Sequence, residues 1–349
     1  MSQTGHPPSS STADRPLDAL AEGSGPQGSG PQGSGPDGSL LEEPVPYGSA
    51  PEGSVLEGSV PQGSTLAGSE AVAVAQVTAD LRPAEDISQA EPPFDATAVV
   101  RLLGLDFADL SLAQAAQYLA ERPADAPFSY VVTPNADHLV RLSRDPRLTA
   151  IYRNAALRVL DSRVVAGLGR RMGLAVPQVV PGSDLTAYLL AEHLRPGEQI
   201  TIVGLSPIWL PSLIARCGLA PPAHYNPPRG FVNDPSAFDA TVSFVQANPA
   251  RFVFLAVGSP QQEYLAAAIA TRGGATGTGV CVGASLEFVA GARKRAPAFM
   301  SEAGLEWLFR LGSEPRRLFR RYLIDSPGVI ALLLKQRLMN ARAGRVPRA

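Results

Sequence analysis

The sequence predicts an α/β fold in which a mainly parallel β-sheet is covered by helices on both faces. Short runs rich in Val and Ile recur along the chain, and most of them end at turn residues. Stretches with helical periodicity lie between these runs. The runs are almost continuously apolar, which is typical of parallel strands that are buried on both sides. Strands that alternate with helices in this way indicate a Rossmann-like layered domain.

The elements follow one another in a regular order. The strands are expected at Ser129–Thr133, Leu157–Leu160, Gln199–Gly204, Arg251–Val257 and Gly279–Gly283. The helices are expected at Ser111–Glu121, Asn135–Arg144, Pro146–Asn154, Arg163–Met172, Asp184–His193, Pro207–Arg216, Pro235–Gln246 and Gln261–Ala270. In such sheets ligands bind beyond the carboxyl ends of the strands. Candidate chemistry is therefore expected just after each strand.

Residues 1–95 are predicted to be a disordered tail. Gly-Ser recurs on a five-residue spacing from Gly23 to Gly68, with one interruption at Glu43. Fourteen acidic residues against Arg15 and Arg82 give this segment a net charge of −12. A chain of Gly, Ser, Pro and acidic residues cannot bury enough apolar surface to offset its conformational entropy. A fibrous or solenoid structure is the alternative.

Residues 293–349 are predicted to be an Arg-rich helical appendage on an α/β core of residues 96–292. Thirteen basic residues against four acidic ones give the appendage a net charge of +9, although the whole chain carries only −2. Aromatic residues are interleaved with the arginines, so phosphate binding, contact with an anionic membrane and a solvated helix pair all stay open. The apolar run Val329–Leu334 is too short to span a membrane and can at most dip into its interface.

Polar residues follow the first two predicted strands. Thr133 and Asn135 come directly after the first strand, where either can cap the next helix or face a ligand. Asp161 follows the second strand and is either another helix cap or a carboxylate that accepts a proton from a hydroxyl nucleophile. Position alone does not separate these alternatives.

The later strands are followed by further candidates. Ser183 or Asp184 can cap a helix that begins after Gly182, and Gly204 belongs to a turn whose backbone N–H groups could face a phosphate. Gly258 precedes Gln262 and Glu263 at the start of another helix. A glutamine amide can both donate and accept hydrogen bonds toward a base or sugar, whereas Glu263 is also explained by the helix dipole.

Several classes of site are not predicted. The sequence has no G-x-x-x-x-G-K-[ST] phosphate loop, no G-x-G-x-x-G fingerprint after a strand, no Asp-x-Asp pair and no cluster with metal-ligand spacing. No cofactor is therefore expected, and arginines would have to neutralise a nucleotide diphosphate. Cys217 and Cys281 are expected to be free thiols in a reducing compartment, and the first residues show no signal peptide.

The ordered set of motifs from Ser129 to Tyr322 resembles the WecG/TagA/CpsF family of bacterial glycosyltransferases. The motifs are T-P-N at Thr133, Asp161, G-x-D-L at Gly182, G-x-P-x-Q-E at Gly258, K-R-A-P at Lys294, G-L-E-W-L-F-R at Gly304 and E-P-x-R-L-x-x-R-Y at Glu314. Each motif is weak by itself, but their order is specific.

The resemblance implies an inverting, metal-independent transfer of a sugar from a UDP-sugar to a polyprenyl-diphosphate-linked sugar in exopolysaccharide or other cell-surface polysaccharide synthesis. It implies Asp161 as the catalytic base and action at the inner face of the cytoplasmic membrane. The remaining residues are implied to bind substrate: Thr133, Asn135, Gly182, Asp184, Gly204, Gly258, Gln262, Glu263, Arg295, Arg310, Arg317 and Arg321.

The sequence departs from the family pattern at two positions. Ser162 stands where many members have glycine after the aspartate, and Val179 stands where many have an arginine that binds the donor. Arg163 or Arg229 could compensate for the missing arginine.

Two other function classes are compatible with parts of the sequence. One is a non-catalytic module that binds a nucleotide sugar or a lipid in an assembly complex. The other is a nucleic-acid binder, which is disfavoured and would show strongly salt-dependent binding. No nucleic-acid partner is expected, and a homo-oligomer is left open.

Overall fold

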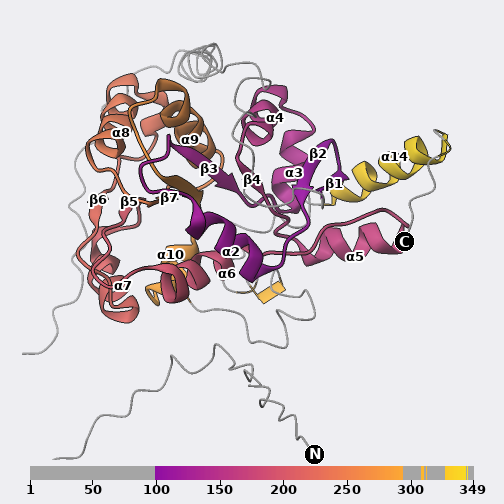
Figure 1. Cartoon of the computed structure of the whole chain (residues 1–349). Helices are drawn as coiled ribbons and strands as arrows, with labels where there is room; N and C mark the ends of the chain where they lie inside the picture. Colours follow the sequence, from indigo (N-terminus) through magenta and orange to yellow (C-terminus); the bar gives the residue numbers. More distant parts are fainter. Residues whose placement is uncertain (1–98, 294–307, 310–311, 313–326, 343, 345–349) are drawn as a thin grey trace, which may run out of the picture. The chain divides into compact units, whose positions relative to one another are not determined.

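A computed structural model describes residues 99–293, 308–309, 312, 327–342 and 344 (Figure 1). These residues all belong to one compact unit, Gln62–Ala349. The predicted tail of residues 1–95 and most of the Arg-rich segment before residue 327 lie outside the described residues.

The core of the fold is a six-stranded sheet with the strand order β4-β3-β8-β7-β5-β6, in which every neighbouring pair is parallel. A separate antiparallel hairpin precedes it. The hairpin strands are β1 (Val99–Leu102) and β2 (Leu105–Ala108), and the sheet strands are β3 (Ser129–Val132), β4 (Leu157–Arg158), β5 (Thr201–Gly204), β6 (Ala223–Tyr225), β7 (Phe252–Ala256) and β8 (Thr278–Cys281). The prediction of a parallel α/β sheet is confirmed.

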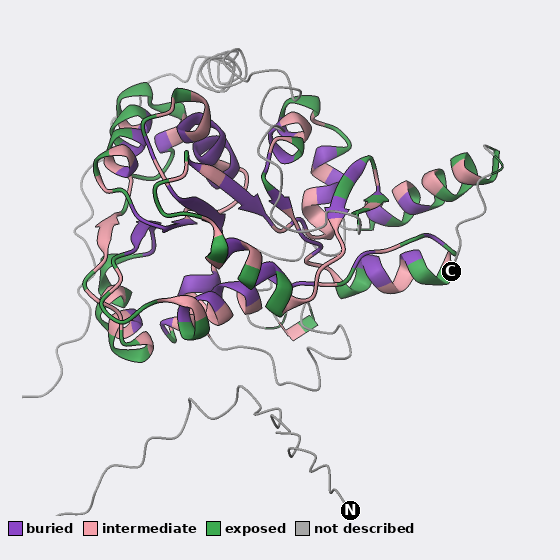
Figure 2. Cartoon of the chain, in the orientation of Figure 1, coloured by how far each residue is buried: buried purple, intermediate pink, exposed green. Residues whose placement is uncertain are grey.

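Both faces of the sheet are buried, as the continuous apolar runs predicted. Neighbouring residues of one strand belong to two different apolar clusters, with Phe254 on one face of β7 and Val253 on the other. Figure 2 shows the strands as a buried layer between helices. Apolar strand residues thus form two cores.

Helices of two groups cover the two faces (Figure 1). One face packs against α3 (Ala136–Leu142), α4 (Pro146–Arg153), α8 (Pro235–Ala247) and α9 (Gln261–Arg272). The other packs against α2 (Leu112–Glu121), α6 (Gly182–Tyr188) with its π-helical continuation η2 (Leu189–His193), α7 (Leu210–Cys217) and α10 (Ser285–Val289). Short 3₁₀ turns, η3 (Pro207–Trp209) and η4 (Phe231–Asn233), precede α7 and α8.

Helix starts are set by local sequence. Side-chain oxygens accept hydrogen bonds from backbone N–H groups of the first turn, and proline often occupies the first helical position, where its missing N–H costs nothing. The capping residues are Ser111, Asn135, Asp145, Ser162 and Asp234, for α2, α3, α4, α5 (Arg163–Arg171) and α8 respectively.

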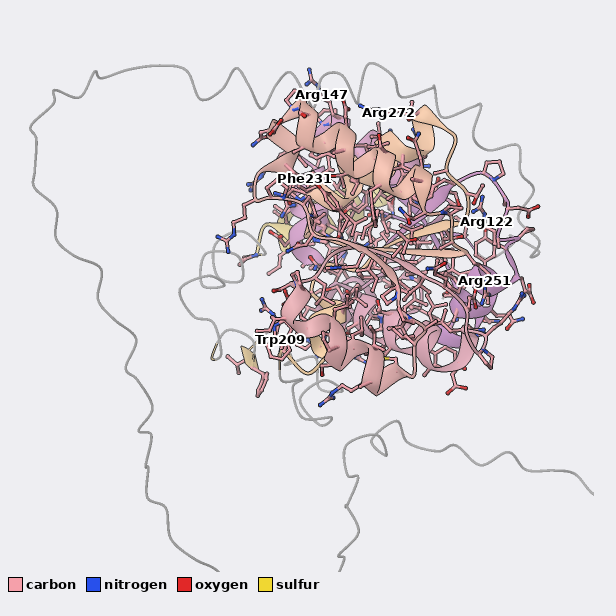
Figure 3. The ribbon with its side chains drawn as sticks, turned by 90° about the vertical axis from the view of Figure 1, so that its left-hand side faces the viewer. Arg122, Arg147, Trp209, Phe231, Arg251 and Arg272 are labelled. Carbon is pink, nitrogen blue, oxygen red and sulfur yellow. The ribbon has the colours of Figure 1, made fainter. Side chains whose placement is uncertain are left out.

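Arginine side chains form hydrogen bonds at the amino-terminal edge of the sheet. Arg251, 6% exposed, donates from Nε and Nη2 to both carboxylate oxygens of Glu198 at 2.6 Å. Arg122 donates to the carbonyls of Pro127 and Gly277. In Figure 3, Arg122 and Arg251 lie on one side of the sheet, and Trp209 and Phe231, which follow β5 and β6, lie on the other. The carboxyl edge of the sheet therefore lies on the side opposite these arginine hydrogen bonds.

The C-terminal helix α14 (Gly328–Arg342) packs on the core, beside α3 and α5. Val329 and Leu333 are 2% and 0% exposed and belong to the main apolar cluster, whereas Ile330 and Leu334 are 41% and 45% exposed. Gln336 Oε1 accepts a hydrogen bond of 2.7 Å from the backbone N–H of Leu103. The helical spacing of four residues directs Val329 and Leu333 into the core, so this face of the run is not available to a membrane interface.

Other predictions were refined or incomplete. The hairpin, β6 and α10 were not predicted, because β6 is a half-buried edge strand of three residues and α10 has only five. The second predicted strand is shorter than expected, but Leu160 still forms an isolated parallel bridge with Val179. Cys281 is buried and Cys217 half-buried, and both are free thiols. Within the described part of the chain, no helix has the length and apolar character needed to cross a membrane.

Candidate active site

The predicted site residues follow different strands but share one edge of the sheet. Thr133 follows β3, Asp161 follows the β4 segment, Gly204 is the last residue of β5, and Gly258 follows β7. All strands of the six-stranded sheet are parallel, so their carboxyl ends lie at the same edge. This edge is therefore the candidate active site.

Thr133, Asp161 and Gly182 come together at this edge. A Cβ atom added to Gly182 would lie 2.6 Å from Thr133 Oγ1 and 3.5 Å from Asp161 Oδ2. A separation of 2.6 Å is too short for a carbon beside a hydroxyl oxygen, so only glycine fits without displacement of a neighbour. Gly182 is therefore a small backbone position between the Thr133 hydroxyl and the Asp161 carboxylate.

Asp161 is held by backbone contacts and is half-buried. Its N–H donates to the Pro134 carbonyl at 3.0 Å, and the preceding Leu160 carbonyl accepts from Val180 N at 2.9 Å. The next helix, α5, is capped by Ser162, whose hydroxyl accepts from Val165 N. The capping alternative for Asp161 is therefore wrong, because Ser162 is the N-cap of α5.

Asn135 does serve as a cap, because its side-chain oxygen accepts from His138 N at 3.2 Å. The expectation that Ser183 or Asp184 caps a helix is wrong. The helix α6 begins earlier, at Gly182, and its N-cap Pro181 makes no side-chain bond. Asp184 instead lies in the first turn, where a carboxylate complements the helix dipole.

The glycines at the end of β5 and after β7 have different surroundings. Gly204 has a φ of +92°, and a Cβ there would lie 2.6 Å from the backbone of Ala256, so the close approach of β5 and β7 requires glycine. Gly258 has a φ of +82°, but a Cβ would meet nothing within 4 Å. Gly258 is therefore required by backbone conformation alone.

Gln262 and Glu263 lie inside the protein, with residue exposures of 4% and 1%. Gln262 Oε1 accepts from the backbone N–H of Gly283 at 2.8 Å, and its Nε2 donates to Glu263 Oε1 at 3.1 Å. The Gln262 amide thus bridges the turns that follow β7 and β8.

Sequence reasoning missed Tyr152, which is fully buried and belongs to α4. Its hydroxyl donates to Glu263 Oε1 at 2.9 Å and lies 3.3 Å from Nδ1 of His138. Burial, and next the Glu263 carboxyl, raises the pKa of Tyr152 well above 10.0. No local pattern around Tyr152 signals this role, because its partners come from other helices.

Arg141 was also missed. It donates to the Ser259 hydroxyl at 3.2 Å and forms a 2.8 Å ion pair with Asp137 four residues earlier. The spacing of the two charges on one helix face could have indicated the ion pair, but not the contact with the turn after β7.

The arginines that were predicted to bind the diphosphate, Arg295, Arg310, Arg317 and Arg321, lie outside the described residues. Arg163 and Arg229 are both exposed, and Val179 packs partly against the core. Arg163 is two residues from Asp161 and begins α5, whereas Arg229 follows β6 at the far end of the sheet.

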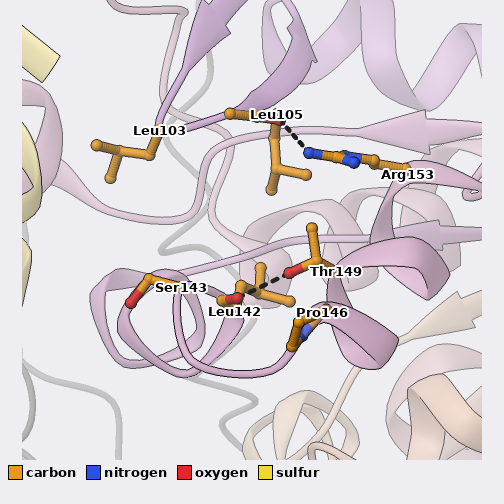
Figure 4. A pocket seen from close by; sticks show the side chains of 8 residues that line it. Leu103, Leu105, Leu142, Ser143, Pro146, Thr149 and Arg153 are labelled. Atoms are coloured by element: carbon orange, nitrogen blue, oxygen red, sulfur yellow. Dashed lines mark hydrogen bonds between the residues drawn. The ribbon is translucent and has the colours of Figure 1, made fainter. Parts of the chain in front are cut away.

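A cavity of about 310 Å³ lies elsewhere, between the β1–β2 turn and the loop that joins α3 to α4 (Figure 4). Its lining includes Leu103, Leu142, Thr149 and Arg153, and none of the predicted site residues contributes to it. In the part of the chain that the structure describes, no group of three His, Cys, Asp or Glu side chains could hold a metal ion.

Comparison with known families agrees with this arrangement. Residues 100–343 match the glycosyl transferase WecG/TagA/CpsF family. The match covers most of the chain, including the six-stranded sheet and α14. The chain therefore belongs to this glycosyltransferase family, as its motifs predicted.

Proposed function

We propose that this member of the WecG/TagA/CpsF family is an inverting glycosyltransferase that moves a hexosyl or N-acetylhexosaminyl group from a UDP-sugar to a polyprenyl-diphosphate-linked sugar. The reaction would serve exopolysaccharide or other cell-surface polysaccharide synthesis. Family membership supports the transfer of a sugar, and the motifs support this choice of donor and acceptor.

The observation that carries the proposal is the position of Asp161. Its carboxylate stands at the carboxyl edge beside Thr133 and Gly182 while Ser162 caps the following helix. We assign Asp161 as the general base, which removes the proton of the acceptor hydroxyl as that oxygen attacks the anomeric carbon. The C–O bond to UDP breaks as the new glycosidic bond forms on the opposite face, so the anomeric configuration inverts.

The remaining groups would bind and orient substrates. The carboxyl edge is formed in part by Thr133, Asn135, Asp184 and the glycines Gly182, Gly204 and Gly258. The Gln262 amide connects the turns that follow β7 and β8. Arg295, Arg310, Arg317 and Arg321 would stabilise the charge on the departing UDP, which is the charge that grows in the transition state. We propose that the reaction needs no metal and no cofactor.

We further propose that the enzyme acts at the inner face of the cytoplasmic membrane as a peripheral protein. The acceptor is anchored in lipid, and the basic, aromatic segment of residues 293–326 has the composition of a segment that contacts an anionic surface. A homo-oligomer at the membrane is compatible with this arrangement.

The test is an assay of the purified full chain with a panel of UDP-sugars and a lipid-diphosphate-linked monosaccharide. We expect transfer with EDTA present and a product of inverted anomeric configuration by NMR. The Asp161→Asn variant should lose transfer by about 10²-fold or more, the scale of general base catalysis, and keep UDP binding. Asp239→Asn, on the surface of α8, is the matched control. Near-normal turnover by the Asp161 variant would refute the assignment.

A further inference from the structure

A chain of buried and partly buried hydrogen bonds joins the segments that follow three adjacent strands, β3, β8 and β7. His138 on α3 contacts the hydroxyl of Tyr152 at 3.3 Å, and Tyr152 donates to Glu263 Oε1 at 2.9 Å. Gln262 Nε2 donates to the same oxygen at 3.1 Å. The chain ends after β8, where Gly283 N donates to Gln262 Oε1 at 2.8 Å.

The last member of this chain sets the orientation of the Gln262 amide. The backbone N–H of Gly283 can only donate, so the Gln262 amide must present its oxygen to Gly283 and its NH₂ group to Glu263. The Tyr152 hydroxyl has one proton, which it gives to Glu263. The Tyr152 oxygen is then available as an acceptor toward His138 Nδ1, a contact whose direction depends on the imidazole tautomer.

In this chain of hydrogen bonds, Glu263 acts as a hydrogen-bond acceptor and not as the partner of an ion pair. Its Oε1 accepts both hydrogen bonds, whereas Oε2 is buried without a hydrogen-bond partner among the described residues. None of the ion pairs in the described part of the chain includes Glu263. An ionised carboxylate is costly to bury without a cation, so the neutral acid fits this position better.

We infer that His138, Tyr152 and Glu263 are positioning residues, which hold the Gln262 amide in one orientation and thereby fix the turn at Gly283. This inference rests on the proposed function, because the turn follows the strand next to β3 and belongs to the edge where transfer would occur. If Gln262 rotated by half a turn, its NH₂ group would face the Gly283 N–H and its oxygen would face Glu263. Two buried hydrogen bonds would then be lost.

Hydrogen exchange tests the positioning directly. In the Tyr152→Phe variant, the peptide that contains Gly283 should exchange about five- to tenfold faster than in the unchanged protein, which corresponds to the loss of one neutral hydrogen bond. Tyr264→Phe is the matched control, because Tyr264 lies on the same helix as Glu263 and its hydroxyl is 3.5 Å from Asp145 instead. Unchanged protection of Gly283 in the Tyr152 variant would overturn the inference.

Kinetics and a conservative substitution separate positioning from general stability. Glu263→Gln keeps an acceptor oxygen, so it should keep more of the Gly283 protection and of kcat/KM than Glu263→Leu, for which we expect about a fivefold to tenfold drop in kcat/KM. Folding of each variant is checked by near-UV circular dichroism. A Gln variant that loses as much as the Leu variant while folded would overturn the acceptor role.

The two proposals can fail separately. If the unchanged protein shows no transfer with any donor, the proposed function fails, and the exchange of the Gly283 amide still decides whether the positioning chain exists. If the unchanged protein transfers sugar but both the Tyr152→Phe and Glu263→Leu variants match it, only the positioning role fails.

Discussion

The hydroxyl of Thr133 and the α-carbon of Gly182 approach so closely that a Cβ at residue 182 would lie 2.6 Å from Thr133 Oγ1. Gly182→Ala should therefore displace Thr133 or α6. We expect it to lower the free energy of unfolding by about 1–3 kcal/mol, the usual cost of overpacking, and to lower transfer activity. Urea denaturation and the sugar-transfer assay measure the two effects.

A double variant tests the cause of that loss. With Thr133→Ala the hydroxyl is gone, and the nearest Thr133 atom left is Cβ, at 3.4 Å from the added carbon. The Gly182→Ala/Thr133→Ala protein should therefore recover most of the stability. Gly167→Ala is the control, since a Cβ there meets nothing within 4 Å and alanine favours the helix. If Gly167→Ala costs as much as Gly182→Ala, the close contact is not the reason.

Ser162 and Asp161 are neighbours with separable roles. Ser162→Ala removes the cap of α5 and should lower the free energy of unfolding by about 1 kcal/mol while transfer continues. Asp161→Asn leaves that cap in place, so it should cost less stability and far more activity. The prediction is checked by urea denaturation and turnover of both variants. A larger loss of stability in Asp161→Asn than in Ser162→Ala would mean that the carboxylate is mainly structural.

Sequence patterns predicted the sheet well because its strands are apolar on both faces. Residues such as Val253 and Phe254 point to opposite cores, so the run has no polar interruptions and reads plainly as a buried strand. The strand β6 was missed because its three residues are only half-buried.

The sequence predicted which residues of the candidate site follow the strands, but not which of them touch one another. Parallel topology explains why Thr133 and Asp161 share an edge, and this much follows from the order of strands and helices. The contact of Gly182 with Thr133 and the bond from Tyr152 to Glu263 depend on tertiary packing between segments far apart in the chain. No local spacing encodes such contacts. Sequence position also cannot decide between Asp161 and Ser162 as the cap of α5, whereas the structure shows that Ser162 is the cap.

The buried Glu263 carboxyl should make stability depend on pH. Burial raises its pKa above the usual 4.5 even though hydrogen bonds from Gln262 and Tyr152 lower it. The folded state then binds more protons than the unfolded state above pH 4.5, so the free energy of unfolding falls as pH rises toward the folded pKa. The slope from one group is at most about 1.4 kcal/mol per pH unit.

The Glu263→Gln variant isolates this contribution, since glutamine does not titrate. The stability of the unchanged protein minus that of the variant should decrease as pH rises above 4.5 and become constant above the folded pKa. Urea denaturation of both proteins across this range gives the difference directly. A difference that stays constant, or that increases with pH, would show that the Glu263 pKa is not raised.

The last prediction concerns α14, whose two adjacent leucines have opposite environments. Leu333 is fully buried against the core, and one of its methyl groups lies near Gly169 of α5, whereas Leu334 is 45% exposed. Leu333→Ala should lower the free energy of unfolding by about 2–4 kcal/mol, because it removes buried methyl groups and leaves a cavity. Leu334→Ala should cost about 0.5 kcal/mol or less. Urea denaturation of the full chain compares them, and equal losses would contradict the docking of α14 through this face.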